Sequence, residues 1–100
     1  MTDNNNFNID QETIQRTGLI ESDAPINAQI APNARVFKYP HLDEVYIMES
    51  DLYGNPMPEG SCFLAFNGNH GFIGKHLEIN TLKNASVNDI KSIVESNENG

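Results

Sequence analysis

The sequence predicts an α+β domain: a small, mainly antiparallel sheet of about four strands with one C-terminal helix packed on it. Two observations predict this class. Between residues 35 and 79, aromatic and β-branched runs alternate with clusters of Gly, Pro and Asn, which is typical of strands joined by turns. After residue 86, apolar side chains recur at helical spacing.

The predicted strands cover residues 35–39, 44–50, 61–66 and 71–79. Pro40 ends the first strand because proline has no N–H to donate to a neighbouring strand. The Asn67-Gly68 pair between the last two strands is the strongest short signal for a hairpin. Consecutive strands joined by short connections usually pair, so we expect a meander.

The predicted C-terminal helix has a clear beginning. Ser86 is a good N-cap, and Asp89 follows three residues later, close to the capping-box pattern. The apolar positions of one helix face are Val87, Ile90, Ile93 and Val94. A helix this short is marginal in water, so this face should lie on the sheet.

The apolar residues divide the chain into three parts. Residues 1–33 hold only one aromatic side chain, and we expect them to form a flexible or extended N-terminal arm. Within this arm, residues 10–17 could form a short helix, with Asn8 or Asp10 as its N-cap and Gly18 as its C-terminal stop, but its apolar positions are few. Residues 34–96 are expected to form the α+β domain, and residues 97–100 a frayed tail.

The charge of the chain restricts its partners. Fourteen acidic residues against six basic ones give a net charge of −8, which opposes direct binding to DNA, RNA or anionic membranes. It favours a protein partner with a basic or mixed surface. The N-terminal residues lack the pattern of a secretory signal, and no apolar run is long enough to span a membrane, so a cytoplasmic location is expected.

Catalytic chemistry finds little support in the sequence. The single Cys62 cannot form an internal disulfide, and as a nucleophile it would need His70 or His76 as its base. The spacing of these residues matches no zinc or transition-metal pattern. We therefore expect no cofactor and no enzyme activity, with a small hydrolase as the third class of function to test.

An interaction surface is the better hypothesis. Acidic residues concentrate around the second predicted strand, and the connection over residues 51–60 is stiffened by two prolines. Tyrosine and methionine exposed on such a connection are good interface anchors. The candidate partner-binding residues are Asp43, Glu44, Glu49, Asp51, Tyr53 and Met57.

The sequence thus predicts a non-enzymatic, acidic protein–protein interaction module. Small, Asn-rich, acidic chains with one cysteine suit an accessory protein of a phage, and an inhibitor of a host protein is the sharper form of this hypothesis. The alternative is a structural subunit of an oligomer or virion, assembled through sheet edges and the N-terminal arm.

Overall fold

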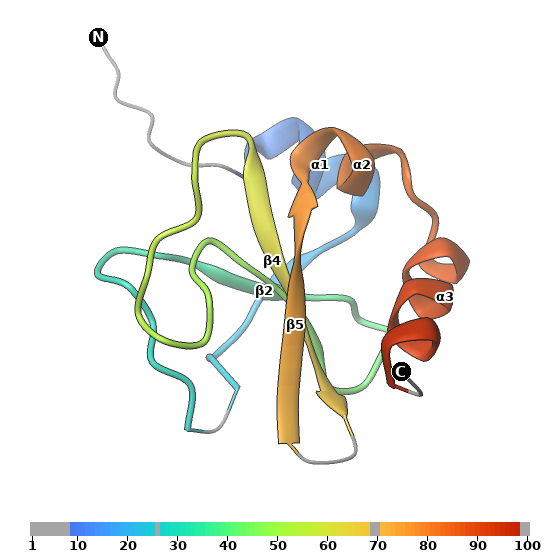
Figure 1. Cartoon of the computed structure of the whole chain (residues 1–100). Coiled ribbons are helices and arrows are strands. Elements are labelled where there is room, and N and C mark those ends of the chain that lie inside the picture. Colours follow the sequence, from blue (N-terminus) through green and yellow to red (C-terminus); the bar gives the residue numbers. More distant parts are fainter. Residues whose placement is uncertain (1–8, 26, 69–70, 99–100) are drawn as a thin grey trace, which may run out of the picture.

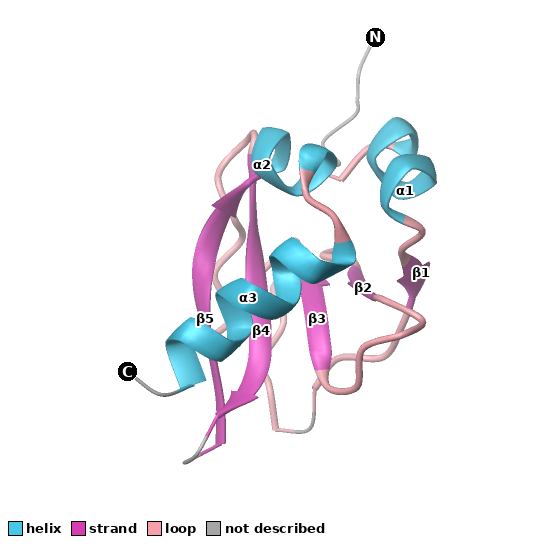
Figure 2. Ribbon diagram, turned by 90° about the vertical axis from the view of Figure 1, so that its right-hand side faces the viewer, coloured by secondary structure: helices cyan, strands magenta, loops and turns pink. Residues whose placement is uncertain are grey.

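The computed structural model describes residues 9–25, 27–68 and 71–98. Their strands form one antiparallel sheet in the order β1-β2-β3-β4-β5, so each strand pairs with its neighbours along the chain (Figure 1 shows the whole chain, and Figure 2 the strand order). The elements are α1 (Gln11–Thr17), β1 (Ile20–Glu21), β2 (Val36–Lys38), β3 (Val45–Met48), β4 (Ser61–Gly68), β5 (Gly71–Glu78), α2 (Ile79–Asn84) and α3 (Val87–Glu98). The α+β class is confirmed, with five strands where about four were expected and with α2 in addition to the expected C-terminal helix.

The larger core lies between one face of the sheet and the three helices of the described residues (Figure 2). Side chains alternate along a strand, so every second residue of β3 and β4 points to this face. The buried residues of this core are Ile9, Leu19, Phe37, Tyr39, Val45, Ile47, Cys62, Leu64, Phe66, Leu77, Ile79, Leu82, Ile90 and Val94. Residues from both ends of the chain therefore close the same core.

The opposite face of the sheet carries a smaller core, made by Val36, Met48, Met57, Phe63 and Ala65. Two long connections cover part of this face. Gln29 and Tyr53 form a parallel bridge between the connections. The Ala31 N–H also donates to the Ser50 hydroxyl at 2.9 Å. The connections are thus fixed to one another as well as to the sheet.

Strands β4 and β5 form the longest pairing of the sheet, from Ser61↔Glu78 to Gly68↔Gly71. Asn67 and Gly68 continue β4 and were expected to form the turn; the chain instead reverses between Gly68 and Gly71, and residues 69–70 lie outside the described residues. Strand β4 approaches position 74 so closely that glycine is needed there, because a Cβ would overlap the Phe63 ring and the Leu64 carbonyl oxygen.

Helix α3 begins as the sequence predicts. The Ser86 N–H donates to the Asp89 carboxylate at 3.0 Å, and the Asp89 N–H donates back to the Ser86 hydroxyl at 3.1 Å. This reciprocal pair is a capping box with aspartate in the place of glutamate. Ile90 and Val94 are buried in the larger core. The helix extends to Glu98, so residues 97 and 98, expected in a frayed tail, belong to it.

The N-terminal segment differs most from expectation. Asp10 caps α1 through its carboxylate, which accepts from the Thr13 N–H at 2.9 Å, and Gly18 ends the helix in the left-handed conformation. Ile9 is 0% exposed and Leu19 is 3% exposed, both in the larger core. Residues 9–25 are therefore part of the folded unit and not a flexible arm, and the expected division at residue 34 does not separate folded from unfolded chain. Residues 1–8 lie outside the described residues.

Candidate partner-binding site

Glu44 lies at the point where the chain enters β3, in the left-handed region of backbone conformation with φ 57°. This conformation costs a residue with a Cβ about 1 kcal/mol. The Val45↔Phe66 pairing of β3 and β4 places Glu44 beside Asn67. The Asn67 amide donates to both oxygens of the exposed Glu44 carboxylate, at 3.0 and 3.3 Å. The pair fixes the position of a carboxylate that faces solvent.

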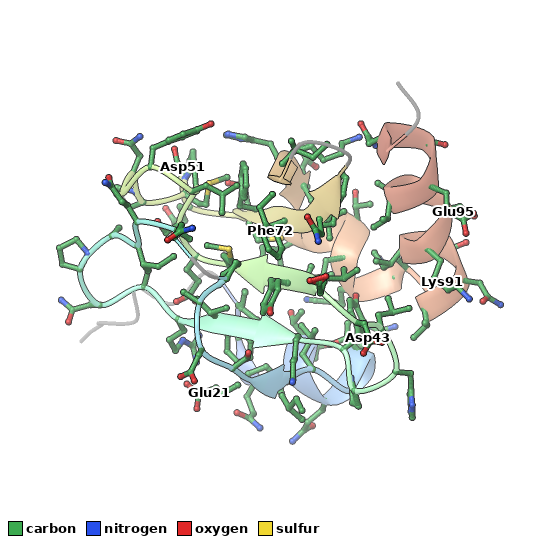
Figure 3. All side chains as sticks on the ribbon, turned by 90° about the horizontal axis from the view of Figure 1, so that it is seen from below. Glu21, Asp43, Asp51, Phe72, Lys91 and Glu95 are labelled. Carbon is green, nitrogen blue, oxygen red and sulfur yellow. The ribbon has the colours of Figure 1, made fainter. Side chains whose placement is uncertain are left out.

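The Glu44–Asn67 pair forms a wall between two surface hollows. The first, which we call the acidic hollow, has a volume of about 310 Å³ and lies between the start of β3 and α3. Its lining residues are Leu42, Asp43, Glu44, Val45, Phe66, Asn67, Lys91, Val94 and Glu95. Figure 3 shows Asp43, Lys91 and Glu95 on the same side of the molecule, from the β2–β3 connection and from α3. The hollow combines an apolar floor with three carboxylates and one ammonium group.

The second, which we call the aromatic hollow, has a volume of about 380 Å³ on the other side of the wall. Its lining residues are Asn27, Ala28, Glu44, Leu52, Tyr53, Asn67, Gly71 and Phe72. Tyr53 is 76% exposed. The Phe72 ring stands edge-on to the Tyr46 ring, with 5.7 Å between the ring centres. Such an edge-to-face pair holds Phe72 in place at the mouth of the hollow.

Asp51 holds the loop that presents Tyr53. Its carboxylate accepts from the N–H groups of Tyr53 and Asn55 at 2.8 and 3.0 Å and from the Asn55 side chain at 3.0 Å. Burial acts to raise the pKa of Asp51, but hydrogen bonds from the Asn55 N–H, the Asn55 amide and the Tyr53 N–H outweigh it and lower the pKa. The carboxylate therefore positions Tyr53, and its negative charge is hydrogen-bonded within its own loop.

Two of the expected partner-binding residues do not lie at the surface. Met57 is 7% exposed and packs in the smaller core, so it is not an exposed anchor. Glu49 is also 7% exposed. Its carboxylate forms an ion pair with Arg35, 2.9 Å between Nη2 and Oε2, and accepts from the Ile9 N–H at 3.1 Å. Both residues stabilise the fold in the positions where the structure places them.

The structure therefore divides the six candidates. It brings Asp43, Glu44 and Tyr53 to the two hollows, places Asp51 behind Tyr53, and buries the remaining two. Sequence reasoning missed Leu52, Asn67 and Phe72, together with Lys91 and Glu95 on α3. Phe72 could have been predicted from the sequence, because an aromatic residue opposite Asn67 on a hairpin lies on a predictable face. The position of α3 beside the start of β3 could not.

Cys62, the candidate nucleophile named from the sequence, is poorly placed for attack on a substrate. Cys62 is 0% exposed, and burial, followed by the charge of Glu49, raises the pKa of its thiol to about 12. A thiol held neutral in this way is a weak nucleophile. Within residues 9–25, 27–68 and 71–98, no three His, Cys, Asp or Glu side chains gather in a way that could hold a metal ion. His70 lies outside the described residues.

Comparison with known proteins adds no relative. No protein-family model matches the chain, and no match was found among curated proteins or solved structures. In the part of the chain that the structure describes, no helix is both long and apolar enough to cross a membrane. The class of protein is therefore defined by the fold alone: an α+β protein with a five-stranded antiparallel meander.

Proposed function

We propose that this protein is a non-enzymatic interaction module that acts in the cytoplasm and binds a basic or mixed surface of another protein. The observation that carries the proposal is the wall formed by Glu44 and Asn67, with an acidic hollow on one side and an aromatic hollow on the other. A partner with a Lys or Arg side chain next to an apolar side chain fits this arrangement. The cation enters the acidic hollow, and the apolar group contacts Tyr53 and Phe72.

Charge supports this choice of partner. The acidic hollow holds Asp43, Glu44 and Glu95 against Lys91. Its apolar floor suits the methylene stem of a long basic side chain, which buries its stem while its charged head meets the carboxylates. The net charge of −8 steers a basic partner toward the molecule and repels DNA, RNA and anionic membranes.

Preorganisation supports the choice of Tyr53 as an anchor. Exposed tyrosines commonly carry a large share of binding energy at protein interfaces. The loop of Tyr53 is held by the Asp51 carboxylate and by the bridge to Gln29. Little conformational freedom is then lost when the partner binds. In its sharper form the proposal is a phage-encoded inhibitor or accessory protein acting on a host protein, which rests on composition.

The test begins with affinity capture from a lysate of the natural host or source at low and at high salt. The captured protein is then purified, and its Kd is measured by calorimetry for the wild type, Glu44→Gln and Tyr53→Ala. Each variant is expected to weaken binding about tenfold, the effect of removing one interface anchor. Glu59→Gln, an exposed acid outside both hollows, is the matched control and should bind like the wild type.

Two results would contradict the proposal. One is that no stoichiometric partner is captured at either salt concentration. The other is a partner whose affinity is the same for the wild type, Glu44→Gln and Tyr53→Ala, since binding would then use another surface. Binding that strengthens with added salt would also contradict the role given to the carboxylates.

The alternative function, a structural subunit, is favoured by a different observation. Strand β5 lies at the edge of the sheet and carries no neighbouring strand on its outer side among the described residues. Exposed edges are a common means of assembly by strand addition.

A further inference from the structure

Strand β5 presents a long open edge. It extends from Gly71 to Glu78, and within the described part of the chain it pairs only with β4. Figure 2 shows it on the outer side of the sheet. All of its residues except Phe72 and Leu77 are exposed. The opposite edge is the two-residue strand β1, so β5 is the longer template for a further strand.

The register determines which backbone groups of β5 face outward. The Ile79 N–H donates to the Gly60 carbonyl at 3.0 Å, one step beyond the Ser61↔Glu78 pair. In an antiparallel pair, hydrogen-bonded and non-hydrogen-bonded positions alternate. The N–H and C=O groups of Phe72, Gly74 and His76 therefore point away from β4. They offer three donors and three acceptors that no other strand of the described residues takes up.

The edge carries only one of the usual devices against pairing with another copy, the lysine at position 75. Prolines, bulges and rows of charge commonly protect edge strands. Between Gly71 and Leu77 the sequence has no proline and no carboxylate, and Lys75 is its one residue that is always charged. In a chain of net charge −8, two copies that pair through residues 71–77 bring no carboxylates of this segment opposite one another.

We propose that β5 pairs with β5 of a second copy of this chain, antiparallel about a two-fold axis, so that the two sheets become continuous. The inference deepens the structural-subunit alternative, and of the residues that it pairs only Gly71 and Phe72 also line the aromatic hollow. It commits to a second copy because residues 71–77 hold no carboxylate, so the same segment of another copy of this acidic chain can pair with it without opposed acids.

The symmetry selects one register. With the axis at Gly74, residues 71–77 of both copies pair, Phe72 lies opposite His76 of the second copy, and Ile73 lies opposite its Lys75. Moving the axis to Lys75 would place two lysines opposite one another, which is destabilising. Moving it to Ile73 would pair only residues 71–75. The axis at Gly74 therefore gives the longest pairing without opposed charges.

Assembly through β5 has a salt dependence opposite to that of the proposed partner. Two copies of charge −8 repel one another, and salt screens this repulsion over a Debye length of about 8 Å at physiological ionic strength. The dimer should therefore strengthen as salt is added, whereas binding of a basic partner should weaken. Measurements at the same salt concentrations can therefore contradict partner binding or pairing through β5 independently of one another.

Sedimentation equilibrium of the full chain over a wide concentration range, at low and at physiological salt, tests the proposal. A monomer–dimer equilibrium that shifts toward dimer with salt is expected. His76→Pro removes an outward N–H and leaves the hydrogen bonds between β4 and β5 intact, since proline is tolerated at such edge positions. It should weaken the dimer about tenfold or more, because two copies of the bond are lost.

A second variant keeps the test independent of backbone effects. Ile73→Lys places a lysine opposite Lys75 of the second copy and should also weaken the dimer. Ile20→Lys is the matched control on the opposite edge, because Ile20 is 45% exposed and Ile73 is 41% exposed. A chain that is monomeric at every concentration and salt overturns the proposal. So does a dimer that neither β5 variant weakens, or one that Ile20→Lys weakens equally.

Discussion

Arg35 and Glu49 form an ion pair that fixes the N-terminal segment to the sheet. The guanidinium and carboxylate are joined by Nη2–Oε2 and Nε–Oε1 contacts of 2.9 and 3.2 Å. The backbone of Ile9 lies against the same pair: its N–H donates to Glu49, and its carbonyl accepts from Arg35. The residue before β2, the residue after β3 and the chain entering α1 thus meet at one buried carboxylate.

Replacing Glu49 by alanine should destabilise the fold by about 3 kcal/mol, the lower end of the range for removing one partner of a buried ion pair. The lower end is expected because the Arg35 side chain is 25% exposed and water can reach it. Urea unfolding followed by circular dichroism measures the change. The control Glu59→Ala should stay within about 0.5 kcal/mol of the wild type, as exposed substitutions do. Equal effects at both positions would refute the role given to Glu49.

Replacing Ile9 by alanine should cost about 3 kcal/mol, because the side chain is 0% exposed and its removal leaves a cavity in the larger core. Ile20, 45% exposed on β1, is the matched position. Ile20→Ala should cost less than about 1 kcal/mol, in proportion to the smaller apolar area it buries. Thermal unfolding of both variants under the same conditions measures the two losses of stability. If Ile9→Ala were as stable as the wild type, residues 9–17 would not be part of the cooperative fold.

The stability of the protein should fall in alkaline solution. Burial, followed by the charge of Glu49, raises the pKa of the Cys62 thiol from 9.0 to about 12, so the unfolded chain loses this proton first. The contribution of the neutral Cys62 thiol to the free energy of unfolding is full below pH 9.0. It is lost as the pH rises toward the pKa of the folded state, by about 1.4 kcal/mol for each pH unit in this window. Burial raises the pKa of Tyr39 as well, which adds to the loss at higher pH. Urea midpoints measured across this range should decline.

Cys62→Ala is the control for the alkaline effect. The variant should be less stable than the wild type at neutral pH, because it leaves a cavity, but its stability should fall less steeply above pH 9.0. Parallel curves for the two proteins would exclude the thiol as a cause. In the native wild type, the thiol should also react slowly with a disulfide reagent, and at the unfolded rate once urea is added.

The loop of Tyr53 should open in acid. The pKa of Asp51 is lowered because its hydrogen bonds outweigh the effect of burial, so its contribution to stability is present above the ordinary value of 3.8 and is lost as the pH falls through the folded-state value. In an NMR titration, the amide signals of Tyr53 and Asn55 should shift together with a midpoint below 3.8. Asp51→Asn should abolish that shared transition. A midpoint at or above the ordinary value would mean that the carboxylate does not hold the loop.

The sequence was sufficient for the elements whose signals are local. The capping pair of Ser86 and Asp89 marks the start of α3, and the runs of residues 61–66 and 71–79 mark the strands of the hairpin. Helix α2 was missed because Ile79 continues the apolar pattern of β5, although the chain turns into a helix there. Its buried side chains meet partners that are distant in sequence.

Glu49 shows what closer reading of the pattern could have found. It follows Val45 and Ile47 in steps of two, so it lies on the face of β3 that these residues bury. A carboxylate there needs a buried partner, and Arg35 stands on the matching face of the adjacent strand. The contact with Ile9 could not have been found in this way, because it depends on how the N-terminal segment returns to the sheet.

The Ile9–Glu49 contact also has a consequence for the order in which the parts of the chain fold. The two residues are separated by 40 positions, while β4 and β5 are neighbours along the chain. Local pairing closes small loops and forms early, whereas a contact over a long separation waits for the surface that receives it. During synthesis, residues 9–17 are added before Glu49, so their partner does not yet exist when they are made. A segment that is made before the residues that receive it is thus among the last to reach its native position.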